Sequence, residues 1–181
     1  MRLRTLALVS AWLAASLLGP TAIADADSAT PYAPLAPLIG EWNVGSPGAA
    51  PAFIERFSWG PNRAYIWMSV ALFAATGEEH LHFEGMIIWN AATGRFDYLF
   101  AVEPGSLTQE QGEFHVAETG EIVRDVVLTR PDGTTGVFRQ TFRALADGHV
   151  ETTLMGQTPD GWKPTFPGSD RLLMLPRKSS S

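Results

Sequence analysis

The chain of 181 residues contains no cysteine. It therefore has no disulfide framework, so packing of the core alone must hold the fold together. A bacterial lipoprotein anchor is excluded as well, because that lipid is attached to a cysteine. Positive charge is also scarce: 13 Lys and Arg stand against 19 Asp and Glu, a net charge of −6. An acidic balance of this kind lacks the electrostatic footprint of a protein that binds nucleic acid or anionic lipid.

Hydrophobic runs long enough to span a membrane are missing too. Residues 6–18 form an uncharged run of 13 residues, whereas a spanning helix needs about 20. The run follows a short basic start and precedes a Gly-Pro pair and the small residues Ala22 and Ala24. This pattern is typical of a secretory signal peptide, residues 1–24. We expect a secreted or periplasmic protein with no membrane span after cleavage.

Removal of residues 1–24 leaves 157 residues, which suits a single domain. The remaining 11 Lys and Arg against 19 Asp and Glu give a net charge of −8. Residues 25–34 are mostly small and polar, and we expect a flexible leader there. The domain proper is predicted over 35–177, and residues 178–181 form a disordered tail.

No segment of the domain shows a sustained helical period. The stretch YAPLAPLIG, residues 32–40, contains two prolines and allows no more than a short helical turn. Elsewhere, runs typical of strands alternate with turn sequences such as NAATG, ETG, PDG and ADG. The predicted strands are 41–45, 52–59, 63–74, 80–90, 95–102, 107–117, 121–130, 135–144, 148–157 and 170–176.

Strands joined by short hairpins must be antiparallel. About ten such strands without a linker favour an all-β fold, a single antiparallel meander closed into a barrel, because closure removes exposed edges. A plain β-sandwich, with Trp42 as a core residue, is the alternative.

Two charged residues fall in strand phases that are otherwise apolar. Glu55 shares a face with Phe57, and Arg124 shares one with neighbouring aliphatic residues. A charge inside a barrel is costly unless it is paired and hydrogen-bonded. Glu55 and Arg124 are therefore predicted to pair with each other or to hold the polar end of a ligand. A misassigned strand phase would instead leave both residues at the surface.

Two histidines that are separated by one residue suggest a metal site in the predicted strand 80–90. His80 and His82 precede Glu84 in the stretch HLHFE. Residues two apart on a strand lie roughly 6.8 Å from each other, so both imidazoles could share one zinc or iron ion. A third ligand would have to come from elsewhere, and His115 is a candidate. A solvated strand end after the preceding turn explains the same residues without a metal.

Motifs of enzymes are mostly absent. The sequence contains no nucleophile elbow and no phosphate-binding loop, and Asp97 and Asp125 are single carboxylates without an evident partner. The sequence therefore favours a protein that is not an enzyme. A hydrolase or isomerase that uses pocket carboxylates remains an alternative.

The segments PLIGEWNV, EGMIIWNAATGRFDYLF, FRQTF and DRLLMLPR, in that order, resemble small exported bacterial barrels that are distantly similar to lipocalins and nitrobindins. The resemblance covers about residues 35–177 and implies that Trp42, in a Gly-x-Trp motif, packs across a closed end. Nitrobindins hold haem through a histidine near the C-terminal end of the barrel. This chain has no histidine after His149, so no haem or other cofactor is expected. Nor is there room for the C-terminal helix of lipocalins after residue 177.

These observations predict an exported, non-enzymatic barrel that binds a small, largely apolar molecule in its lumen. The expected ligand-binding residues are Trp42, Glu55, Phe57, Tyr98 and Arg124. Two alternatives remain. One is a metal-dependent enzyme that uses His80 and His82. The other is a packed barrel that acts through protein contacts in the cell envelope, as a homodimer for example, because strand 63–74 is apolar on both faces. That apolar outer side could also be covered by the N-terminal segment.

Overall fold

The computed structural model describes residues 30–102 and 108–177. The expected signal peptide, the first part of the leader and the tail lie outside these ranges. Within them, the chain forms eleven strands and two short 3₁₀-helices. In chain order these are η1 (Ala33–Leu38), β1 (Gly40–Gly45), β2 (Phe53–Trp59), η2 (Pro61–Arg63), β3 (Ile66–Phe73), β4 (Glu79–Asn90), β5 (Arg95–Val102), β6 (Gln109–Val116), β7 (Ile122–Thr129), β8 (Thr135–Ala144), β9 (Val150–Thr158), β10 (Gly161–Pro164) and β11 (Leu172–Pro176).

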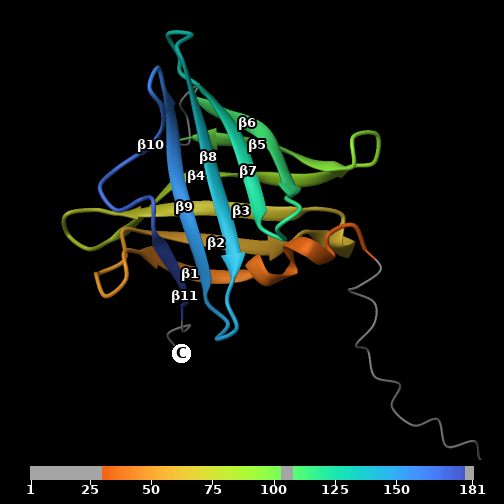
Figure 1. The fold of residues 1–181 in the computed structure, drawn as a ribbon, viewed down its shortest axis with the longest axis horizontal. Helices are drawn as coiled ribbons and strands as arrows, with labels where there is room; N and C mark the ends of the chain where they lie inside the picture. The colour runs from red at the N-terminus through yellow and green to blue at the C-terminus, as the bar shows by residue number, and fades with distance from the viewer. Residues whose placement is uncertain (1–29, 103–107, 178–181) are drawn as a thin grey trace, which may run out of the picture.

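Ten strands close into one antiparallel barrel, as the sequence predicts. Strands β1 to β9 each pair with the next, and β11 fills the gap between β9 and β1. Figure 1 shows β7, β8 and β9 crossing in front of β2, β3 and β4, as strands on opposite walls of a barrel do. The eleventh strand, β10, lies outside the ring and pairs with β9 only. Sequence analysis missed β10, because its four residues are exposed and show no alternation of apolar and polar side chains.

The hairpins are built by the local chemistry that the sequence contains. In the PDG turn between β7 and β8, the Asp132 carboxylate accepts a hydrogen bond from the backbone nitrogen of Thr134 at 2.9 Å. Gly133 lies between them with a φ of 81°, which side chains disfavour. Asp147 and Gly148 repeat this arrangement before β9, with His149 as the donor at 3.0 Å.

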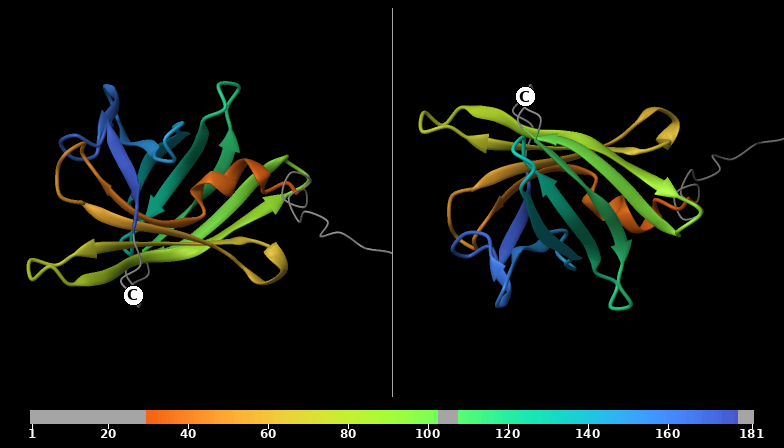
Figure 2. Two further views of the ribbon diagram at one scale, coloured as in Figure 1. Left: turned by 90° about the horizontal axis from the view of Figure 1, so that it is seen from below. Right: turned by 90° about the horizontal axis from the view of Figure 1, so that it is seen from above.

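The N-terminal turn closes one end of the barrel. Leu35 and Leu38 of η1 are fully buried in the core, and the Leu38 carbonyl accepts a 2.7 Å hydrogen bond from Trp42 Nε1. Tyr32 Oη donates to the Ala64 carbonyl and accepts from the backbone nitrogen of Trp89. Figure 2 shows η1 between the walls of the barrel. Tyr32 falls in the expected flexible leader, yet it is packed against the barrel.

Helix η1 covers the end of the barrel, so residues 33–38 do not cover the outer side of β3. That side is partly exposed and apolar at Trp67. Within the described residues, no helix has the length and apolar character that a membrane span requires.

Candidate functional site

A cavity of about 290 Å³ opens from the lumen at the end opposite η1. Its floor lies near the middle of the barrel, and its rim is formed where β2, β6 and β8 begin and β3 and β7 end. The rim is apolar and, apart from Phe53, only partly buried. It consists of Phe53, Leu72, Leu128, Phe138, Leu154 and Phe166. The volume is near the lower end of the range of roughly 300–1,000 Å³ that small-molecule pockets occupy.

Buried polar side chains form a continuous chain at the floor of this cavity. Glu55 on β2 lies across the barrel from β7 and β8, and Gln140 on β8 connects it to Arg124 on β7. Gln140 Nε2 donates to Glu55 Oε1 at 2.8 Å, and Gln140 Oε1 accepts from Arg124 Nη1 at 2.8 Å. The Arg124 guanidinium also pairs with Glu110 on β6. A further hydrogen bond of 3.3 Å joins Gln140 Nε2 to Thr152 Oγ1 on β9.

Glu55 and Arg124 are both inside the barrel, so the alternative that placed them at the surface is wrong. Their relative exposures are 1% and 4%. The two do not form a direct ion pair, because Gln140 stands between them. A glutamine side chain can do this because it carries both a donor and an acceptor.

Arg124 is held on every side. Its Nε donates to Tyr98 Oη at 3.3 Å, so all three guanidinium nitrogens have a partner. The rings of Phe83 and Tyr98 lie 5.2 and 5.1 Å from its Cζ, close enough for cation–π contact. Burial is the largest single influence and lowers the pKa of Arg124, but the effects of Tyr98, Glu110 and Glu55 together outweigh it and raise the pKa. Arg124 is therefore a fixed positive charge within the wall.

Glu55 is held on one side only. Its Oε1 accepts from Gln140, whereas Oε2 is buried and has no hydrogen-bond partner among the described residues. Burial raises the pKa of Glu55 to about 7, against smaller lowering effects of Gln140 and Arg124. Glu55 is therefore a carboxyl group at the cavity with one oxygen that has no hydrogen-bond partner among the described residues and with a pKa near neutrality.

The other expected ligand-binding residues lie inside the barrel but outside the lining of the cavity. Trp42 and Phe57 are buried closer to the closed end, with exposures of 6% and 2%. Tyr98, 4% exposed, lies behind Arg124 and contacts it. Contact of these three with a ligand stays a prediction, whereas Glu55 and Arg124 line the cavity directly.

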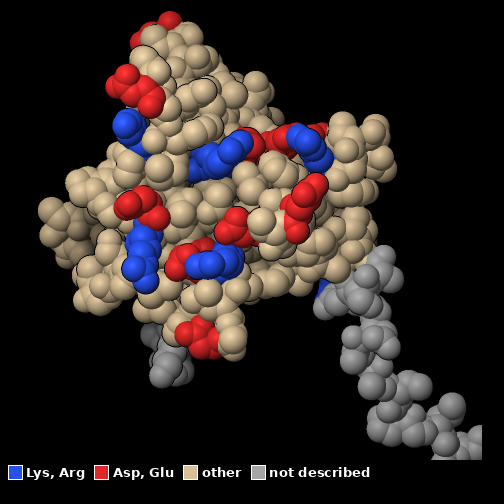
Figure 3. Space-filling model, in the orientation of Figure 1, with Lys and Arg blue, Asp and Glu red and all other residues tan. Residues whose placement is uncertain are grey.

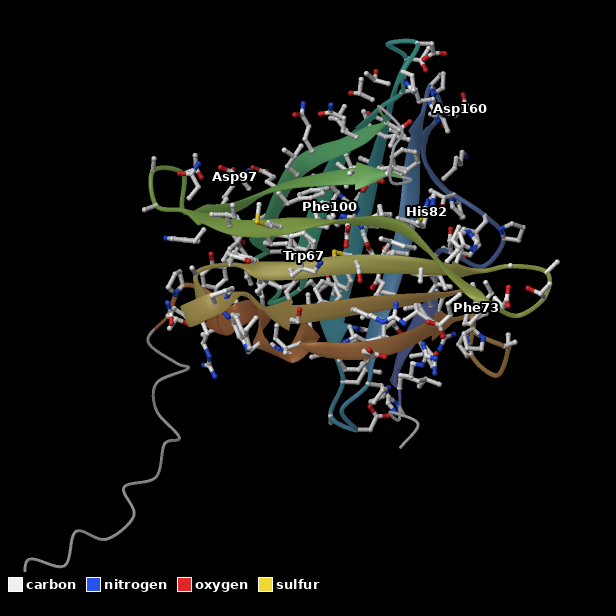
Figure 4. All side chains as sticks on the ribbon, turned by 180° about the vertical axis from the view of Figure 1, so that it is seen from behind. Trp67, Phe73, His82, Asp97, Phe100 and Asp160 are labelled. Carbon is white, nitrogen blue, oxygen red and sulfur yellow. The ribbon has the colours of Figure 1, made fainter. Side chains whose placement is uncertain are left out.

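The ladder between β3 and β4 is irregular next to His82, so the regular alternation of side chains stops at this residue. Phe83 lies opposite Val70 while Leu81 lies opposite Ala71, which leaves His82 without a partner at a bulge. His82, labelled in Figure 4, lines the cavity. His80 is exposed and is not part of the lining. Among the described residues, neither histidine belongs to a group of three metal-ligating side chains.

Such a group does exist on the outer face, where Glu113, His115 and Asp125 bring ligand atoms within 4.8 Å of one another. Both carboxylates already have cationic partners: Arg95 pairs with Glu113, and Arg139 holds Asp125 through two hydrogen bonds of 2.7 and 3.0 Å. Figure 3 shows acidic and basic side chains lying side by side over one outer face of the barrel. These residues are accounted for as a surface ion-pair network.

Sequence analysis missed Gln140 and Glu110 as members of the site. A signal for Gln140 was present, since it lies between Phe138 and Phe142 in the inward phase of β8. Glu110 carried no such signal, because β6 is polar in both phases over its first half. Asp97 and Asp125, the single carboxylates, have partners on the outer surface in Asn90 and Arg139.

No family model matches this chain, and no curated protein is significantly similar to it. The resemblance to lipocalins and nitrobindins therefore stays a prediction. The function of the barrel has to be argued from the geometry of the site itself.

Proposed function

We propose that this protein is an exported, non-enzymatic barrel that binds a small, largely apolar molecule in its lumen. The observation that carries the proposal is the cavity of about 290 Å³, which has apolar walls and a buried polar floor. A mostly apolar pocket with a few fixed polar groups is the usual form of a small-molecule site. Export is supported by the signal-like residues 1–24.

The asymmetry of the two ends supports the same function. Leu35 and Leu38 of η1 fill one end completely. At the other end, Phe138 and Phe166 are only partly buried, although both pack against the core. Because apolar rings at the rim gain by covering an apolar guest, the end opposite η1 is the entrance that we propose.

The test is native mass spectrometry of untagged protein purified from the envelope fraction of its own host. An added organic mass of a few hundred daltons is expected. A Val126→Phe variant places a ring in the cavity, since Val126 lines it, and should lose the added mass. Val127→Phe is the matched control, because Val127 is the next residue on β7 and is 36% exposed. Bare protein in all three cases would refute the proposal.

One feature of the outer wall favours a second candidate, association through protein contacts. Aligned positions on successive strands carry a row of apolar side chains with one glutamine in it. We call this the outer apolar row: Trp67, Met86, Leu99, Gln111, Val127 and Val137. Leu99 is 58% exposed and Met86 is 37% exposed. Figure 4 shows Trp67 on the same side of the molecule as β4 and β5. An exposed apolar row of this kind is typical of contact surfaces.

A further inference from the structure

The charges around the cavity do not suit an anionic ligand, although an arginine lines it. Arg124 would be the natural partner of a carboxylate, yet its three nitrogens already bind Tyr98, Gln140 and Glu110. Among the described residues, no other Lys or Arg lines the cavity. An anion entering this space would meet Glu55 and Glu110 without a free cation to offset them.

Glu55 gives the cavity its unused capacity for hydrogen bonding. The side chain is 1% exposed, and Oε2 has no partner among the described residues. A buried acceptor without a donor is destabilising, because it has lost the hydrogen bonds that water would make with it. A ligand that brings a donor to Oε2 recovers this free energy, so the geometry selects for ligands with a donor at their polar end.

Charge balance distinguishes between a neutral and a cationic donor. With Glu55 ionised, Arg124 is matched against two carboxylates, Glu55 and Glu110, which leaves a net charge of −1 around the cavity. The other titratable side chain that lines this space is His82 on β4. Tyr98 on β5 lies behind Arg124, and the neutral Gln140 on β8 is hydrogen-bonded to Thr152 on β9. A hydroxyl group would leave the excess negative charge unmatched, whereas an ammonium group would neutralise it.

Aromatic rings in the wall of the cavity also favour an ammonium group over a hydroxyl group as the donor. Phe53, Phe83, Phe138 and Phe166 line the cavity. The face of an aromatic ring attracts a cation, most strongly where water is excluded. The same rings provide apolar surface for the rest of the ligand.

We infer that the cavity takes a small apolar amine, whose protonated nitrogen pairs with the Glu55 carboxylate at the floor while its hydrocarbon part contacts the phenylalanines of the wall. This inference rests on the proposed function, because it specifies the ligand of the same cavity. Arg124 is then a positioning residue, which orients Gln140 and through it Glu55.

The experiment compares three probes that share one hydrocarbon body: phenylbutylamine, phenylbutanol and phenylbutyrate. Each is titrated at pH 8 into the purified protein, and dissociation constants are measured by protein-observed NMR. At this pH Glu55, with its pKa of about 7, is mostly ionised, and an alkylamine is protonated. We expect the amine to bind roughly 10- to 100-fold tighter than the alcohol, and the carboxylate to bind least.

Two variants connect the preference to Glu55. Glu55→Gln keeps the acceptor for Gln140 but removes the charge, so the amine should fall to the affinity of the alcohol while alcohol binding persists. In the wild type, the preference for the amine should shrink about tenfold per pH unit below the pKa of Glu55. His82→Asn must retain this pH dependence, because the preference is assigned to Glu55 and not to the histidine that also lines the cavity.

Each other outcome has a definite meaning. If the alcohol binds as tightly as the amine, or the carboxylate binds best, the amine inference is overturned while lumen binding stands. If Glu55→Gln keeps the preference, the assignment to Glu55 is wrong. If none of the three probes binds, the amine inference fails and the proposed lumen function loses its support as well.

Discussion

At the scale of single residues, Glu55 is the most informative side chain in this protein. It is buried beside apolar groups, and one of its two oxygens has no partner among the described residues. A carboxyl group in such a place is destabilising when ionised, because Gln140 and Arg124 offset only part of the cost of burying its charge. In the function that we propose, a ligand supplies the missing partner and offsets this cost.

The raised pKa of Glu55 predicts how stability depends on pH. From 4.5 in the unfolded chain to about 7 in the barrel, the change in pKa corresponds to roughly 3 kcal/mol. The folded protein holds the proton more tightly, so this stabilisation is present below about pH 4.5. This stabilisation is lost progressively as the pH rises from about 4.5 to about 7. Above pH 7, ionisation of Glu55 no longer changes the stability of the protein.

Glu55→Gln should therefore gain stability relative to the wild type by about 2–3 kcal/mol between pH 5 and pH 8. Urea unfolding at both pH values measures the difference. Glu118→Gln is the control, since Glu118 is exposed in the turn between β6 and β7, and it should track the wild type. A constant difference between Glu55→Gln and the wild type would show that Glu55 is not the group that titrates.

At the scale of elements, inward-facing glycines let the strands coil around large rings. Gly112 of β6 lies opposite Tyr98 of β5, and Gly85 of β4 lies opposite Phe100. A Cβ atom on Gly112 would stand 1.9 Å from the Asp125 carbonyl oxygen and 3.1 Å from Cε1 of Tyr98. Glycine is needed here because backbone and ring approach closely, and Tyr98 in turn contacts Arg124.

Gly112→Ala should therefore destabilise the protein by about 1–3 kcal/mol, because the backbone of β7 cannot yield without disturbing the ladder. Chemical denaturation gives this value. Gln111→Ala on the same strand is the control, because Gln111 is exposed on the outer wall and should change stability little. Equal stability of the two variants would show that β6 can move away from β7 at no cost.

The elements themselves were largely predictable, because hairpin turns and two-residue alternation are local properties. The expected strands agree with β1 to β9 and β11, with boundaries shifted by a few residues at most. In β5 the alternation is regular, so Phe96, Tyr98 and Phe100 face inward as expected. In β4 the alternation of inward and outward side chains fails at His82, where the strand has a bulge. The bulge could not be predicted, because it depends on how β3 pairs with β4 and not on the sequence of β4 alone.

At the scale of the whole molecule, closure of the barrel gives two surfaces with different uses. The inside contains the core and the cavity, and the outside carries ion pairs together with the outer apolar row. Exposed ion pairs contribute little, on the order of 0–1 kcal/mol each, so they serve solubility more than stability. The outer apolar row differs from the rest of the outer wall, because its side chains are mostly apolar and take no part in these ion pairs.

The second candidate function predicts a dimer that forms through the outer apolar row. Sedimentation velocity at increasing protein concentration should show monomer passing into dimer, and Leu99→Lys should shift this transition to higher concentration. The control is Leu175→Lys on β11, because Leu175 is 43% exposed but lies outside the row. A wild-type protein that stays monomeric throughout the micromolar range would remove this candidate.

The sequence by itself determined the strands, most of their turns and the absence of a disulfide framework. It predicted an inward phase for Glu55 and Arg124 but left a surface position as the alternative. Each of these follows from neighbours within a few residues of one another. Only the tertiary structure decided that Gln140, 85 residues from Glu55, stands between Glu55 and Arg124, and that Arg124 is occupied while Glu55 keeps a free oxygen. Those facts depend on which strands face each other across the lumen, and that pairing is set by closure of the barrel and not by any local pattern.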